Sequence, residues 1–131
     1  MSRKILIIED DRGAARLAGY TLEQAGYEVV NAYDGFDGLN RAIEDRPDLV
    51  VLDIMLPGLD GYEVCNRLRQ KPETAMLPIL MMSAKVRQED KDVGLKMGAD
   101  DYLTKPVEPS VMLAKVRILL SNAGKVVYDE S

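Results

Sequence analysis

Strand-like apolar runs alternate regularly with helical segments along the chain, and this order constrains the fold more than any other feature. The runs typical of buried strands occupy residues 4–8, 27–33, 49–53, 78–83 and 101–104. Segments with helical periodicity follow them at residues 11–26, 35–45, 61–70, 87–97 and 109–121. Strands that alternate with helices in this way form a parallel sheet covered on both faces.

Right-handed crossovers leave few topologies for five strands and five helices. We expect an α/β fold with the doubly wound, flavodoxin-like strand order 2-1-3-4-5. Such sheets bind ligands beyond the carboxyl ends of the strands, at the switch point between strands 1 and 3. The chain has 131 residues, the size of one domain. We expect this domain at residues 1–122, with residues 123–131 as a C-terminal tail or the start of a linker.

Composition limits the chemistry that is available. A net charge of −5 argues against direct binding of nucleic acid, which calls for clustered basic residues. No apolar run approaches the ~20 residues that span a bilayer, and the N-terminal run is too short for a secretory signal, so a cytoplasmic location is expected. Histidine is absent and Cys65 is the single cysteine, which excludes zinc sites and Ser-His or Cys-His catalysis.

Carboxylates stand at the ends of two strands that the expected order makes neighbours. Glu9, Asp10 and Asp11 follow the first strand, and Asp53 ends the third. Because neighbouring strands lie ~4.8 Å apart, Asp53 and part of the first group should converge and repel one another unless a cation joins them. Mg²⁺ prefers such oxygen ligands. The alternative is that the first group merely begins a helix, where acidic residues suit the dipole, but this leaves Asp53 unexplained.

Two further polar side chains follow strands at the same edge. Ser83 ends the fourth strand, and Lys105 follows the fifth in "TKP". A carboxylate flanked by Mg²⁺ and a lysine is suited to accept a phosphoryl group, to which a hydroxyl could donate a hydrogen bond. Pro106 permits a cis peptide that would aim Lys105 inward. The plainer interpretations are a surface lysine before a turn and an ordinary serine at a strand end.

Four segments together resemble the receiver domain of two-component response regulators: "ILIIEDD", "LVVLDIMLPGLDGYEV", "PILMMSA" and "GADDYLTKPVEP". The resemblance covers residues 3–121. It implies that Asp53 accepts a phosphoryl group from a histidine kinase or histidine phosphotransferase, which is a signalling role and not an enzymatic one. By similarity, the side chains of Asp10 and Asp53 ligate Mg²⁺, Glu9 acts through water and Met55 through its backbone carbonyl.

The resemblance also implies a switch. Ser83 is similar to the switch hydroxyl of the family, Lys105 to its lysine and Tyr102 to its aromatic switch residue. We expect Ser83 to move toward the phosphoryl group and Tyr102 to turn inward. The surface of the fourth helix, fifth strand and fifth helix would then change and control a partner or output domain. The loop after the acceptor matches the family at Pro57, Gly58 and Gly61.

The helix at residues 109–121 carries more apolar residues than one buried stripe uses, so some should be exposed on a partner surface. The alternative is a deeply buried helix. Response regulators with transcriptional output domains dimerise through this face, which makes a homodimer an expectation with its geometry left open. Residues that are similar to that pattern are Asp100, Asp101, Lys91, Lys115, Leu95 and Leu113, whereas Asp92, Lys96, Val111 and Asn122 depart from it.

Positions two residues beyond the acceptor and the switch hydroxyl tune hydrolysis in the family, and here they are Met55 and Lys85. Apolar Met55 predicts slow self-hydrolysis. A phosphatase of the haloacid dehalogenase type would need a second Asp where this chain has Met55. A flavodoxin-like electron carrier would need a first loop that binds phosphate, which Glu9, Asp10 and Asp11 would repel. A degenerate receiver that only binds partners is disfavoured because every expected site position is filled.

Overall fold

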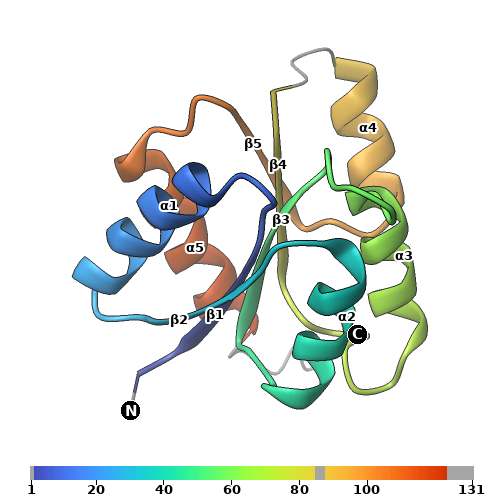
Figure 1. Cartoon of the computed structure of the whole chain (residues 1–131), viewed down its shortest axis with the longest axis horizontal. Helices are drawn as coiled ribbons and strands as arrows, with labels where there is room; N and C mark the ends of the chain where they lie inside the picture. The colour runs from blue at the N-terminus through green and yellow to red at the C-terminus, as the bar shows by residue number, and fades with distance from the viewer. Residues whose placement is uncertain (1, 85–87, 124–131) are drawn as a thin grey trace, which may run out of the picture.

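The computed structural model describes residues 2–84 and 88–123; Lys85 and most of the expected tail lie outside these residues. Figure 1 shows strands and helices in the predicted alternation. The strands are β1 (Lys4–Ile8), β2 (Glu28–Ala32), β3 (Leu49–Asp53), β4 (Ile79–Ser83) and β5 (Asp101–Thr104). The helices are α1 (Arg12–Gln24), α2 (Gly35–Glu44), α3 (Gly61–Gln70), α4 (Gln88–Lys96) and α5 (Pro109–Ala123). The ten predicted elements are therefore confirmed, and where an end differs from the prediction the shift is one or two residues.

All five strands run parallel in the order β2-β1-β3-β4-β5, as predicted. The register pairs Ile8 with Leu52 and Asp53 with Met82. The residues that follow β1, β3, β4 and β5 therefore meet at one edge of the sheet, because parallel strands bring their carboxyl ends together.

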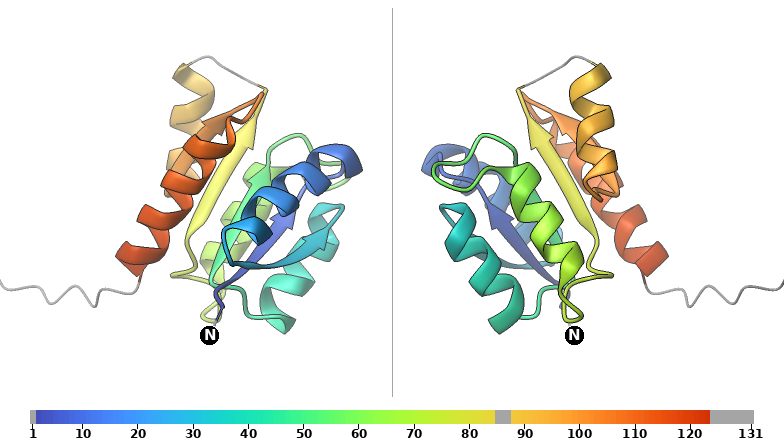
Figure 2. Two further views of the ribbon diagram at one scale, coloured as in Figure 1. Left: turned by 90° about the vertical axis from the view of Figure 1, so that its left-hand side faces the viewer. Right: turned by 90° about the vertical axis from the view of Figure 1, so that its right-hand side faces the viewer.

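Two apolar layers cover the sheet, one on each face. Residues of α2 and α3 pack with alternate residues of β1, β3 and β4 on one side, where α4 also lies. Residues of α1 and α5 pack with the intervening strand residues on the other. Figure 2 shows α1 and α5 on the side of the sheet opposite to α3 and α4. The strands β1, β3 and β4 are buried on both faces, which explains their continuous apolar sequences.

Aspartate side chains cap three of the helices. Asp11 accepts a hydrogen bond from the N–H of Ala14 at the start of α1, and Asp34 and Asp60 do the same at α2 and α3. The side chain of Asp11 therefore has a structural role beside the acidic cluster, while its backbone N–H donates to Oε2 of Glu9 at 3.1 Å. No helix of the described segments is long and apolar enough to cross a membrane.

The apolar stripe of α1 is only partly buried. Leu22 is buried, but Leu17 is 61% exposed although it shares the predicted face. The residues that α1 buries beside Leu22 are the small ones, Ala15 and Gly19. Small side chains bring the helix close to the sheet, so the larger Leu17 is left at the margin facing α5.

Candidate functional site

Three side chains that are remote in sequence meet at the carboxyl edge of the sheet. Lys105, which follows β5, donates hydrogen bonds from Nζ to Oε1 of Glu9 and, at 3.3 Å, to Oδ2 of Asp53. Glu9 is fully buried and Asp53 is nearly so. The ammonium group of Lys105 thus lies between two buried carboxylates, and the plainer interpretation of Lys105 as a surface charge is wrong.

Asp10 completes an acidic cluster with Glu9 and Asp53. One carboxylate oxygen from each of the three lies within 4.8 Å of the others. Among the residues that the structure describes, Lys105 is the cation paired with these carboxylates, so this part of the site carries excess negative charge. Oxygen donors at this spacing fit the preferences of Mg²⁺, and a dication would relieve the repulsion.

The electrostatic environment keeps Lys105 charged and works against charge on Glu9. Burial raises the pKa of the Glu9 carboxyl; the hydrogen bond from Lys105 opposes this change, and the neighbouring Asp53 adds to it. Burial alone would lower the pKa of Lys105, but its contacts with Glu9 and Asp53 outweigh burial and raise it. Lys105 therefore remains a cation, and a bound metal ion would stabilise the charged form of Glu9.

The loop after β3 shapes the surroundings of Asp53. The backbone N–H of Met55 donates to Oδ1 of Asp53 at 3.3 Å, and the Met55 side chain is 59% exposed. Gly58 has a φ of 75°, which glycine adopts readily. Gly61 is needed for another reason: a Cβ there would lie 2.4 Å from the carbonyl oxygen of Asp53. Glycine lets α3 begin directly against the strand that carries the candidate acceptor.

Ser83 ends the strand next to that of Asp53, and Tyr102 lies one strand further along the sheet, opposite Met81 in the register. Ser83 is fully buried at the end of β4, whose Met82 pairs with Asp53 in the register. Tyr102 is only 8% exposed, so its ring already lies inward in this structure. The ring packs near α4, where a Cβ on Gly94 would be 3.5 Å from it, and Lys91 Nζ lies 6.0 Å from its centroid.

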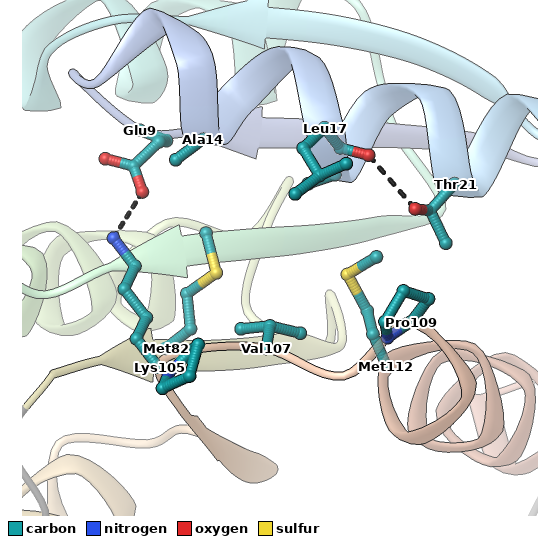
Figure 3. A pocket seen from close by; sticks show the side chains of 11 residues that line it. Glu9, Ala14, Leu17, Thr21, Met82, Lys105, Val107, Pro109 and Met112 are labelled. Atoms are coloured by element: carbon teal, nitrogen blue, oxygen red, sulfur yellow. Dashed lines mark hydrogen bonds and ion pairs between the residues drawn. The ribbon is translucent and has the colours of Figure 1, made fainter.

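An apolar groove of about 240 Å³ runs from the Lys105–Glu9 pair between α1 and the segment that leads into α5. Figure 3 shows Leu17 on one wall of this groove and Val107, Pro109 and Met112 on the other. The sequence did not indicate this groove. The exposed position of Leu17 depends on how far α5 lies from α1, which helical periodicity does not report.

The prediction that some apolar residues of α5 are exposed is confirmed, whereas their use as a partner surface stays a prediction. Val111 and Ile118 are exposed, whereas Met112, Val116 and Leu120 are buried, so the alternative of a deeply buried helix is wrong. Lys115 forms an ion pair with Asp101 at 2.9 Å within the chain.

These features together define a class of protein: a doubly wound domain with an acidic cluster at its switch point, joined by a lysine from the end of β5. The sequence matches the response regulator receiver domain family over residues 5–117, and the chain belongs to this family. It is therefore a signalling domain of two-component systems whose general role is that of a phosphoacceptor.

Two curated relatives are similar over nearly the whole chain. The alkaline phosphatase synthesis transcriptional regulatory protein PhoP of Bacillus subtilis (strain 168) is 48% identical over 120 residues, which are 92% of this chain and 49% of that protein. The DNA-binding dual master transcriptional regulator RpaA of Synechocystis is 47% identical over 123 residues, 94% of this chain and 51% of that protein. The chain thus spans about half the length of these relatives.

The fold is also that of solved receiver structures. A putative response regulator from Chloroflexus aurantiacus has a TM-score of 0.89 and 40% identity, covering 92% of this chain and 99% of that one. The Vibrio cholerae chemotaxis protein CheY4 has a TM-score of 0.86 and 30% identity, covering 91% and 99%. The predicted fold class is confirmed by these likenesses.

Proposed function

We propose that Asp53 is the phosphoacceptor and takes the phosphoryl group of a phosphohistidine on a histidine kinase or histidine phosphotransferase. A carboxylate oxygen of Asp53 forms a bond to phosphorus while the bond between phosphorus and the donor imidazole nitrogen breaks. The observation that carries this proposal is the position of Asp53: a nearly buried carboxylate contacted by Lys105 and clustered with Glu9 and Asp10.

The residues around Asp53 have distinct tasks in this transfer. We assign the Mg²⁺ site to the side chains of Asp10 and Asp53, with Glu9 acting through water and Met55 through its backbone carbonyl; the ion would offset charge on the transferred oxygens. Lys105 supplies a fixed positive charge on the other side. Its raised pKa keeps it protonated at neutral pH, so it can donate to a phosphoryl oxygen throughout.

The output of the domain is proposed to be a change in the packing of α4, β5 and α5. A phosphoryl group adds about −1.5 to −2 charge beside Ser83, whose hydroxyl can donate to it. Movement of Ser83 would favour the inward position of Tyr102 that the structure contains. The equilibrium between two packings then shifts, and the exposed face that includes Val111 and Ile118 controls an output domain, another protein or a second copy of the chain.

The groove between α1 and α5 supports a position for the donor. Its apolar walls end at Lys105 and Glu9, so a donor segment seated there lies next to Asp53. Leu17 projects into this groove (Figure 3) and offers exposed apolar surface for the contact. The donor would therefore recognise α1 and the start of α5, and transfer would occur at the end of the groove.

Labelling with acetyl phosphate tests the acceptor. This small donor needs no docking surface, so incorporation reports the chemistry of the site alone. We expect the intact chain with Mg²⁺ to incorporate label and the Asp53→Asn variant to incorporate none. Label retained by that variant would refute the assignment of Asp53.

Comparison of two donors tests the docking groove. Leu17→Asp should reduce transfer from the phosphorylated cognate kinase at least tenfold, while labelling from acetyl phosphate stays unchanged. Tyr20→Asp is the matched control, because Tyr20 is equally exposed on α1 but does not line the groove. Equal loss in both variants would argue against the groove.

A further inference from the structure

Arg69, near the end of α3, connects three segments at the edge of the sheet opposite to Asp53. Its Nε donates to the carbonyl oxygen of Gly98 at 2.9 Å, just beyond α4. Its Nη2 donates to the carboxylate of Asp100 at 2.9 Å, before β5. Its Nη1 points to carbonyl oxygens of the α3–β4 connection, those of Thr74, Ala75 and Leu77 at 3.4, 3.1 and 2.6 Å. One guanidinium thus joins the α3–β4 connection, the residue after α4 and the residue before β5.

Additional hydrogen bonds join the same end of α4 to the rest of the domain. The Cys65 thiol on α3 donates to the carbonyl oxygen of Met97 at 3.3 Å. Burial raises the pKa of that thiol to about 11, so it keeps its proton at neutral pH and remains a donor. Asp100 accepts from the N–H of Ile79 at 2.8 Å and donates its own N–H to the Ile79 carbonyl oxygen at 2.9 Å.

Two glycines adapt α4 to this arrangement. Gly98 has a φ of 109°, and a Cβ at this position would lie 2.8 Å from Cγ of Arg69, so the arginine stem passes directly over the glycine. Gly94 is the point where α4 touches the sheet: a Cβ there would lie 2.8 Å from Sδ of Met81. The helix therefore rests on Met81 and Tyr102 at Gly94 and is tied to α3 at Gly98.

We propose that Arg69 is a positioning residue that fixes the C-terminal end of α4 and makes it the pivot of the switch. A helix that is held at its C-terminal end moves least there, and its displacement increases toward its N-terminal end. When the packing around Tyr102 changes, the displacement of α4 would therefore be largest near residue 88 and smallest near residues 97–100. We call the hydrogen bonds of Arg69 to Gly98 and Asp100 the anchor. The part of this inference that concerns switching rests on the proposed function; the anchor itself does not.

Hydrogen exchange resolved to single amides by NMR tests the anchor in the unphosphorylated chain. The amides of Met97, Gly98, Ala99 and Asp100 all donate to backbone carbonyls, so they report local opening of this end. We expect Arg69→Gln to speed their exchange at least tenfold relative to the amides of β1. Arg67→Gln is the control, because the ion pair of Arg67 is with Glu63 on the same helix, and its side chain makes no ion pair with α4 or β5 among the described residues. Arg67→Gln should leave the exchange rates at residues 97–100, relative to those of β1, unchanged.

A purely structural role for Arg69 has a different signature. If Arg69→Gln speeds exchange in β1 and at residues 97–100 by the same factor, the arginine only stabilises the whole domain and the proposal is overturned. Unchanged exchange at residues 97–100 would overturn it as well. Should Arg69→Gln fail to fold, Asp100→Asn removes the carboxylate charge from one arm of the anchor, and the same local acceleration, smaller in size, is expected.

Beryllofluoride with Mg²⁺ tests the pivot. In the natural sequence, exchange rates in α4 should change most toward residue 88 and least at residues 97–100. In Arg69→Gln the change should extend through residues 97–100. A change of equal size at both ends of the natural chain would overturn the pivot. If beryllofluoride raises the melting temperature but changes no amide of α4, the α4 switch of the proposed function is wrong, whereas the anchor is judged by the first measurement.

Discussion

The ammonium group of Lys105 lies 3.3 Å from the carboxylate of Asp53, although 52 residues separate the two in sequence. Because the same nitrogen also donates to Glu9, one cation serves both the candidate acceptor and the most deeply buried acid of the site. This shared contact has separate consequences for phosphoryl transfer and for stability.

Replacement of Lys105 by Gln should slow labelling by acetyl phosphate at least about tenfold, because an amide does not offset charge on the transferred oxygens. Magnesium should bind as tightly or more tightly, since the competing cation has been removed from between Glu9 and Asp53. Labelling rates and titration calorimetry measure the two effects. Lys71→Gln is the control, because Lys71 lies beyond α3 at the other edge of the sheet. An unchanged labelling rate in Lys105→Gln would show that the lysine takes no part in transfer.

Glu9→Gln should stabilise the metal-free protein at pH 7 by on the order of 1 kcal/mol while it weakens magnesium binding. Burial raises the pKa of Glu9, so charge on this carboxylate opposes folding. Between the ordinary carboxyl pKa and this raised value, the folded protein holds more protons than the unfolded chain. Its free energy of unfolding therefore falls as pH rises through that window.

The advantage of Glu9→Gln over the natural chain should accordingly shrink as pH falls from 7 toward 4.5, and urea denaturation in EDTA measures it. Glu23→Gln, an exposed position on α1, serves as the control and should differ little from the natural chain at any pH. A Glu9→Gln variant less stable than the natural chain at pH 7 would mean that the contact with Lys105 outweighs burial.

The lifetime of the acyl phosphate should depend on Met55. Its exposed side chain cannot orient water for attack on phosphorus, so we expect a lifetime of minutes or longer in the natural chain. Met55→Gln offers hydrogen bonds to water and should shorten the lifetime several-fold. Loss of label over time measures this, with Met76→Gln as control, since Met76 is 89% exposed in the remote α3–β4 connection. A natural lifetime of seconds would contradict the prediction. Lys85, the other position expected to tune hydrolysis, lies outside the described residues.

Sequence periodicity was sufficient for the fold because β1, β3 and β4 are short and buried on both faces, so they appear as continuous apolar runs between helical segments. The placement of Asp53 followed from the same rule: a carboxylate that ends a buried parallel strand must lie at the switch edge. The direct contact between Lys105 and Glu9 was not predictable in the same way. It depends on the path of the chain after β5, which no local pattern specifies.

Arg69 shows a second limit of sequence reasoning. Within "CNRLRQ" it looks like Arg67, an exposed basic residue in the last turn of a helix. Its partners Gly98 and Asp100 lie about 30 residues away, and they become neighbours only when α3 and α4 pack on the same face of the sheet. Leu17 is the opposite case, since a residue on the predicted buried face faces an open groove.

The last prediction concerns dimerisation through the α4–β5–α5 face. Ile118 is exposed on α5, so a dimer through this face would bury it. With beryllofluoride and Mg²⁺ we expect the natural chain to elute as a dimer and Ile118→Asp to remain monomeric, because burying an unpaired carboxylate costs several kcal/mol. Light scattering confirms the masses.

Arg117→Asp is the control, because it introduces a carboxylate, with a larger change in charge than Ile118→Asp, at the adjacent exposed position, which helical geometry turns about 100° away from Ile118. It should dimerise like the natural chain. An unchanged elution volume of the natural chain would count against phosphorylation-driven dimers. A dimer that persists in Ile118→Asp would use another surface. Arg117→Asp and Ile118→Asp therefore separate a contact at one side of α5 from a general effect of charge.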